Sequence, residues 1–286
     1  VASSDYTKSF PSVHLAHDLT ANLKARLSWS TSFGRPDMTN MFPNETPNEA
    51  GAFVTVNNAG LLPQTSRNWD ANVDYYFKPA GFVSVGWFHK TIKDFIVAGA
   101  TVGQIGDGAD NGYNGEYRGF ELRSSINGGT ATVRGIEFTY QQQFVFLPGL
   151  LKGLSLMANY TALETYGDFG GTTQLSSGSV AGFVPRVYNL VPGWRYGRFS
   201  CRVRISYTSG YLDTYNAASP ALNVYLISRV LVSPSFAFDL RPSLTLTCEV
   251  SNVTNEHQVR YQVKRDRVRQ ERDNPTNITF GVKSRF

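Results

Sequence analysis

The chain has 286 residues, a formal net charge of +5, 41% hydrophobic residues and a mean hydropathy of -0.25. No apolar run approaches the roughly 20 residues that a membrane-spanning helix needs, so a bundle of membrane helices is excluded. The modest, dispersed charge gives no reason to expect a nucleic-acid partner. The 19 Phe, 15 Tyr and 26 Gly are instead typical of many strands and turns.

Apolar and polar residues alternate along most of the chain, and this period of two predicts extended strands. In the second predicted strand, Leu23 and Leu27 alternate with Lys24 and Arg26. Many of the segments have about 12 residues or more, against about 5–6 in ordinary sheets, so they are too long for a soluble sandwich. In chain order, the pattern predicts eleven strands over 7–19, 22–34, 65–77, 81–97, 133–146, 153–167, 183–196, 199–212, 223–240, 243–255 and 276–286.

Short and long connections alternate strictly between these strands. The short ones are "LTAN", "KPAG", "PGLLKG", "YGR" and "LRPS", and the long ones span 35–64, 98–132, 168–182, 213–222 and 256–275. An up-and-down meander with such connections has tight turns at one rim and long loops at the other, as outer-membrane barrels do. We therefore predict an all-β fold, a transmembrane antiparallel up-and-down β-barrel.

One face of the predicted strands carries many charges and amides. A dry sandwich core would not tolerate so many charged groups without partners, so we expect this face to line a wet lumen and the apolar face to contact lipid. The alternative is a soluble barrel or sheet whose apolar face lies under a second protein layer. The residues expected to face the lumen include Arg26, Asp70, Asp74, Glu137, Arg204 and Glu249.

The last ten residues, "NITFGVKSRF", continue the alternation to the chain end. Ile278, Phe280, Val282 and Phe286 share one side, which only Ser284 interrupts. This ending resembles the C-terminal insertion signal of outer-membrane barrel proteins, which usually finish in an aromatic residue, and Phe286 is assigned that role. The C-terminus is then periplasmic and the long loops are extracellular. Bacterial single-chain barrels have an even number of strands, so eleven strands predict an odd number of further strands upstream.

Several segments together resemble TonB-dependent receptors. The segments are "FGRPDMTNMFP", "NWDANVDYYF" with "GFVSVGWFHKTIKDFI", "VRGIEFTYQQQF" with "LKGLSLMANYTALET", "VPRVYNLVPGWRYG" and "SLTLTCEVSNVTNEHQVRY". Each motif is weak alone, but their order and spacing cover essentially the whole chain. The family has about 22 strands around a plug, so the resemblance implies that residues 1–286 are the C-terminal half of such a barrel. The plug domain and the first half of the barrel would lie outside this chain.

The resemblance also implies a function. Such receptors of Gram-negative bacteria take up a scarce ligand, such as a siderophore, cobalamin or an oligosaccharide, through energy supplied by TonB. The expected partners are TonB, through an N-terminal region, a small-molecule or glycan ligand, and outer-membrane lipid with lipopolysaccharide. Two alternatives stay open: a passive porin-like channel, and a surface anchor or adhesin that uses the barrel only as a scaffold.

Candidate ligand contacts are aromatic residues in the long loops, because aromatic side chains dominate many binding sites. They are Tyr113, Tyr117, Tyr166, Phe169, Tyr211 and Tyr215, and packing between loops is the alternative role. The basic stretch 264–273 suits either lipopolysaccharide phosphates or, more simply, a solvated charged hairpin. No spacing of His, Cys, Asp or Glu indicates a metal site, a cofactor or an enzyme, and Cys201 and Cys248 are expected on lipid-facing positions two strands apart.

Overall fold

The computed structural model describes residues 7–167, 179–214 and 220–284. Its main element is an antiparallel sheet of eleven strands, in the order β1-β2-β5-β6-β9-β10-β11-β12-β15-β16-β19. This confirms the predicted strand number and the up-and-down order. The strands are β1 Ser12–Thr20, β2 Leu23–Gly34, β5 Gln64–Phe77, β6 Gly81–Lys93, β9 Thr130–Gln143, β10 Leu154–Gly167, β11 Arg186–Tyr196, β12 Phe199–Thr208, β15 Arg229–Arg241, β16 Leu244–Ser251 and β19 Asn277–Ser284.

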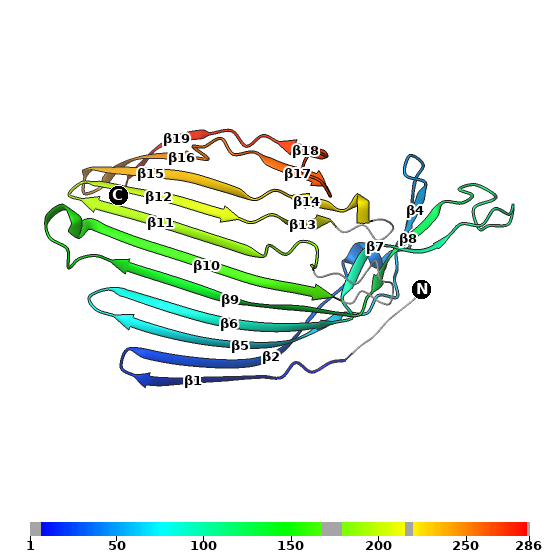
Figure 1. Ribbon diagram of the computed structural model, residues 1–286, viewed down its shortest axis with the longest axis horizontal. Helices are drawn as coiled ribbons and strands as arrows, with labels where there is room; N and C mark the ends of the chain where they lie inside the picture. The colour runs from blue at the N-terminus through cyan, green and yellow to red at the C-terminus, as the bar shows by residue number, and fades with distance from the viewer. Residues whose placement is uncertain (1–6, 168–178, 215–219, 285–286) are drawn as a thin grey trace.

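The two rims of this sheet differ as the connection lengths predict. All five short connections lie at one end of the strands, and the long ones lie at the other end (Figure 1). The sheet is not closed, because β1 pairs only with β2 and β19 pairs only with β16. These eleven strands therefore form an open wall rather than a complete barrel.

Two small sheets stand on the long-loop rim and were not predicted. The first is β3-β4-β8-β7, in which β4 and β8 pair in parallel, and the second is β13-β14-β17-β18. Both appear beyond the ends of the long strands in Figure 1. Their strands are β3 Glu45–Asn48, β4 Phe53–Val56, β7 Ile96–Gln104, β8 Glu121–Asn127, β13 Tyr211–Thr214, β14 Val224–Leu226, β17 Gln258–Gln262 and β18 Val268–Arg272.

These small sheets correct several predicted boundaries. The predicted strand 81–97 is two strands, because β6 ends at Lys93 and β7 begins at Ile96 after Asp94, whose φ is 55°. The predicted strands 199–212 and 223–240 are likewise interrupted, between β12 and β13 and between β14 and β15. The helical elements described are three short 3-10 turns, η1 Met38–Met41, η2 Gly149–Gly153 and η3 Pro220–Leu222. No helix in the described part of the chain is long and apolar enough to cross a membrane.

The distribution of burial is the reverse of that in a globular domain. The one buried apolar cluster given by the described residues is small, contains Val97, Ala100, Ala131 and Val180, and lies at the long-loop rim. Along the wall, apolar side chains remain exposed, with Ile136 at 50%. Within the described residues no second protein layer covers the apolar face.

Close contact between β9 and β10 depends on Gly135. A Cβ at this position would lie 2.2 Å from the carbonyl oxygen of Ala162 and 2.8 Å from the ring of Phe88. No Cβ fits at such distances from a backbone atom, so the two strands approach here only because the residue is glycine.

Candidate functional site

The polar face of the wall is built by registered rows of hydrophilic side chains. One row crosses six neighbouring strands and consists of Asp74, Ser84, Thr139, Asn159, Asn189 and Ser206. Because side chains alternate along a strand, residues opposite each other in register share a face. The polar positions of distant strands therefore line the same side of the wall, which we call the polar face.

All six residues predicted to face a lumen lie on this polar face. Arg26 and Asp74 form an ion pair between β2 and β5, in which the Asp74 side chain is only 7% exposed. Asp70 is opposite Ser28, and Glu137 is opposite Gly86. Arg204 and Glu249, with Arg202, line a hollow of about 370 Å³ between β12, β15, β16 and β19.

The opposite face, which we call the apolar face, is equally continuous. One row consists of Ala25, Val73, Val85, Phe138, Tyr160, Tyr188, Tyr207 and Val230. A second row places Phe236 between Cys201 and Cys248, so the two cysteines are separated by a whole strand, and both are free. This confirms that they lie on the apolar face two strands apart.

Tyr113 and Tyr117 are brought together in the loop between β7 and β8. Their rings are in edge-to-face contact at 5.7 Å between centroids. Asn111 organises this loop, because its Oδ1 accepts the backbone N–H groups of Tyr113 at 2.9 Å and Gly115 at 3.0 Å. Burial raises the pKa of the Tyr113 phenol, and the charge of Glu45 and a hydrogen bond to it act in the same direction. Tyr113 and Tyr117 therefore pack against each other within the loop, and the phenol of Tyr113 is neutral.

Tyr166 lies apart from that pair, at the end of β10. It is 43% exposed, and the guanidinium of Arg134 lies 5.6 Å from the centroid of its ring. By register it is opposite Thr132, which shares a face with Arg134 and Ile136. Tyr166 therefore points to the apolar face, away from the polar face where a ligand in the lumen would lie. Phe169, Tyr215 and Phe286 lie outside the described residues.

Tyr211 lines a cavity of about 400 Å³ where β12 and β15 meet the second small sheet. We call it the tyrosine cavity. Tyr225 and Tyr261 stack in it at 5.6 Å between ring centroids. Its other lining residues include Tyr207, Phe183 and Arg265. The sequence analysis did not single out Tyr225 and Tyr261. They could have been found as aromatic residues that, like Tyr211, stand where a long strand runs into a long loop.

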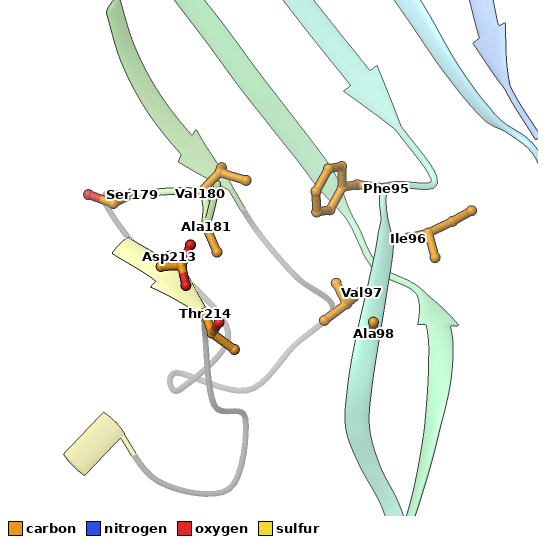
Figure 2. A pocket seen from close by; sticks show the side chains of 9 residues that line it. All are labelled: Phe95, Ile96, Val97, Ala98, Ser179, Val180, Ala181, Asp213 and Thr214. Atoms are coloured by element: carbon orange, nitrogen blue, oxygen red, sulfur yellow. The ribbon is translucent and has the colours of Figure 1, made fainter. Parts of the chain in front are cut away.

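A second cavity, of about 250 Å³, lies between the two small sheets. Phe95, Ile96 and Val97 line one side of it, and Val180 and Asp213 line the other (Figure 2). Asp213 is engaged there by Arg260, whose Nε lies 3.1 Å from its Oδ2. The charge of Asp213 is thus largely balanced, and the cavity is mainly apolar.

Comparison with known proteins identifies the wall. A family model described as "TonB dependent receptor-like, beta-barrel" matches residues 1–253. The chain belongs to this family. It is a family of outer-membrane receptors and transporters, not of enzymes. No curated protein matches the chain.

Solved structures of TonB-dependent receptors have the same fold. A mutant of the ferric enterobactin receptor PfeA from Pseudomonas aeruginosa is 16% identical with a TM-score of 0.68, over 96% of this chain and 40% of that chain. The siderophore receptor PirA from the same organism is 17% identical with a TM-score of 0.62, over 97% and 42%. The ferric-catecholate import receptor Fiu from E. coli K12 is 14% identical with a TM-score of 0.63, over 96% and 34%. The chain thus spans about 40% or less of the length of most of these receptors.

The last candidate on the TonB-dependent receptor wall is the basic stretch of the final long loop. The basic stretch 264–273 contributes to the β17–β18 hairpin, in which Arg260 donates to Gln270 at 2.8 Å and His257 lies 3.0 Å from Glu271. It therefore forms the charged hairpin with cross-strand pairs that was expected as the simpler role. Within the described residues, no group of three or more His, Cys, Asp or Glu side chains could hold a metal ion.

Proposed function

We propose that this chain forms the second half of the barrel wall of an outer-membrane receptor that takes up a scarce ligand with energy from TonB. The ligand classes that fit are a siderophore, cobalamin or an oligosaccharide. The observation that carries the proposal is the two-faced wall of eleven strands, with a continuous polar face and an exposed apolar face. A membrane barrel needs both faces, because one side contacts hydrocarbon and the other contacts water.

The first half of the barrel and a plug domain complete this receptor. The open edges of β1 and β19 pair with the missing strands, since an unpaired strand edge cannot be exposed to hydrocarbon. The polar face then surrounds the plug. Arg204 and Glu249 form no ion pair within the described residues, so they are available to contact it. TonB acts through the N-terminal region of the complete receptor.

The long-loop rim is extracellular in this proposal, and the short turns and the C-terminus are periplasmic. The ligand binds at the extracellular mouth, where the loop aromatics Tyr113, Tyr117 and Tyr211 are described, and the insertion signal at Phe286 is on the periplasmic side. The tyrosine cavity is the best-formed candidate, because it joins four tyrosines to a size that suits part of a small ligand. Phe169 and Tyr215, which lie outside the described residues, complete the proposed set of contacts, and Tyr166 is left out because it points to the apolar face.

Ligand uptake by cells that carry the complete receptor tests this function. We expect uptake of radiolabelled siderophores, cobalamin or oligosaccharides to require both TonB and the proton gradient. Uptake that persists without TonB would instead favour a passive channel, and receptor-dependent adhesion without any uptake would favour a surface anchor. Conductance of the purified receptor in a planar bilayer separates those two outcomes.

A pair of variants tests the tyrosine cavity. Tyr211→Ala should weaken binding of the transported ligand by about tenfold, as loss of an aromatic anchor often does. Tyr196→Ala is the matched control, because Tyr196 is 55% exposed at the opposite rim. Equal affinities of both variants and the unmodified receptor would exclude the cavity as the ligand site.

A further inference from the structure

The strands β16 and β19 continue beyond the wall as the hairpin β17–β18 (Figure 1), and the register changes between the two parts. Ser251 is opposite Asn277 at the end of the wall, and Gln258 is opposite Arg272 at the start of the hairpin. The chain therefore advances seven residues from Ser251 to Gln258, while the facing strand advances five. Two extra residues lie on the side that leads from β16 to β17.

The neighbour on the other side gives the same count. Glu249 is opposite Ser235, and Arg260 is opposite Leu226. From Glu249 to Arg260 the chain advances eleven residues, whereas the neighbouring chain advances nine between their partners. Since both neighbours are shorter by two residues, the extra residues belong to the segment 252–257. We call this segment the bulge, because extra residues in one strand interrupt the hydrogen-bond ladder of a sheet.

The side chain of Asn252 closes the bulge. Its Oδ1 accepts the backbone N–H of Glu256 at 2.9 Å, and its Nδ2 donates to the carbonyl oxygens of Glu256, at 3.0 Å, and of Asn274. In return, the hydroxyl of Thr276 donates to the carbonyl oxygen of Asn252 at 2.7 Å. Asn252 is only 3% exposed. One buried amide therefore joins the two ends of the bulge and ties them to the facing strand.

The backbone of the bulge also favours asparagine. Asn252 and Asn255 have φ values of 51° and 52°, in the left-handed region, which asparagine adopts more readily than most residues. The two asparagines differ in their side chains, because that of Asn255 is exposed and its nitrogen lies 3.3 Å from Nε2 of His257. The same backbone conformation is thus combined with a buried side chain at Asn252 and an exposed one at Asn255.

The bulge decides which of two alignments β17 adopts against β14. If the register of the wall continued unchanged, Tyr225 would be opposite Val259. In the observed alignment Tyr225 is opposite Tyr261, and the two rings stack at 5.6 Å between centroids. The two alignments differ by two residues, so every side chain keeps its face and the pattern of polar and apolar residues cannot choose between them. Another feature must select the observed alignment.

We propose that Asn252 is the positioning residue of the tyrosine cavity. By closing the bulge, its side chain retains the two extra residues between β16 and β17 and so aligns Tyr261 with Tyr225. Asn252 is not one of the described residues that line the cavity, and it acts through the position of β17. A slip of β17 would leave buried polar groups of the bulge without partners, which is costly. The consequence for ligand binding rests on the proposed function, whereas the alignment itself does not.

The test uses the complete receptor, purified in detergent, in which Cys201→Ala and Cys248→Ala remove the native thiols of this chain. Two cysteine pairs report the alignment through disulfide formation on mild oxidation, measured by mass spectrometry of the cleaved peptides. Tyr225→Cys with Tyr261→Cys reports the observed alignment, because residues opposite each other in a sheet lie within reach of a disulfide. Tyr225→Cys with Val259→Cys reports the slipped alignment. The readout is the ratio of the first disulfide product to the second.

Asn252→Gly should lower this ratio about tenfold, because the buried backbone groups of Glu256 and Asn274 lose their partner. Glycine accepts the φ of 51° at this position, so the change reports the side chain and not the backbone. The matched control, Asn255→Gly, changes the other left-handed residue of the bulge and should keep the ratio found with both asparagines in place. An unchanged ratio in Asn252→Gly, or an equal fall in Asn255→Gly, would overturn the proposal.

Two further variants decide the question if Asn252→Gly does not fold, which the heat-dependent shift of gel mobility shows. Asn252→Asp keeps an oxygen that accepts the N–H of Glu256 but loses the donor, so its ratio should lie between those of the asparagine and glycine forms. Deletion of Thr254 and Asn255 removes the two extra residues, so the observed alignment should form even in combination with Asn252→Gly. An Asn252→Asp ratio equal to that of asparagine, or a deletion variant that gives mainly the slipped product, would contradict the role of Asn252. Because disulfide formation needs neither a transported ligand nor TonB, failure of the uptake proposal would leave this result unchanged.

Discussion

The assignment of the two faces can be tested with one charge placed on either side of a single strand. Ile136 is at the middle of β9, is 50% exposed and faces away from the polar side. Glu137, the next residue, faces the polar side, where it is opposite Gly86. An arginine in hydrocarbon near the centre of a bilayer costs about 2–4 kcal/mol, whereas one in an aqueous lumen costs little. Ile136→Arg should therefore destabilise the complete receptor by about 2–4 kcal/mol and Glu137→Arg by less than about 1 kcal/mol.

The measurement is the guanidinium midpoint of the receptor in lipid vesicles, followed by tryptophan fluorescence, with gel mobility as an independent measure of the folded fraction. Ile136→Gln separates the effect of charge from the loss of apolar contact, and it should fall between the two arginine variants. The reasoning fails if Ile136→Arg is as stable as Glu137→Arg. It also fails if Glu137→Arg is the more damaging change, because Ile136 would then not face hydrocarbon.

Two further predictions concern the close packing and the chemistry of the wall. Gly135→Val should lower the thermal midpoint of the receptor, because the new Cβ would overlap the backbone of β10. Gly86→Ala should be tolerated, because the atom nearest to its new Cβ, the side-chain nitrogen of Asn72, lies 3.4 Å away. Equal thermal midpoints of the two variants would contradict this prediction. In vesicles, Cys201 and Cys248 should resist a charged thiol reagent and should not form a disulfide on oxidation, whereas Ser200→Cys, on the polar face, should react readily. Rapid labelling of the native cysteines, measured by mass spectrometry, would place them in water.

The long strands could be predicted from the sequence because their periodicity is a local property. In β5, Trp69, Val73 and Tyr75 fall on one face of a strand of fourteen residues, and a helix would not place these three residues on one face. Polar groups on the second face then require water, and the alternation of short and long connections separates the two rims. These inferences need only the order of residues along the chain, and the structure confirms the long strands, their two faces and the two rims.

The elements of the long loops could not be predicted in the same way. β4 has four residues and pairs in parallel with β8, which lies more than sixty residues away in the chain. A run of four residues is too short to show a period, and its partner is fixed only by the folded wall. The tyrosine cavity has the same origin, because Tyr225 meets Tyr261 only through the pairing of β14 with β17.

The register between β2 and β5 shows how both faces are specified together. A shift of one residue would turn Arg26 toward hydrocarbon and Trp29 toward water, because the side-chain period is two. A shift of two residues would keep each side chain on its face but would no longer place Trp29 opposite Trp69, and in one of its two directions it would also move Arg26 away from Asp74. In the observed register, with Lys24 opposite Asp74, both pairs form together, one on each face. An ion pair on one side and a directly opposed aromatic pair on the other therefore favour the same alignment, even though neither face of the wall has a buried core.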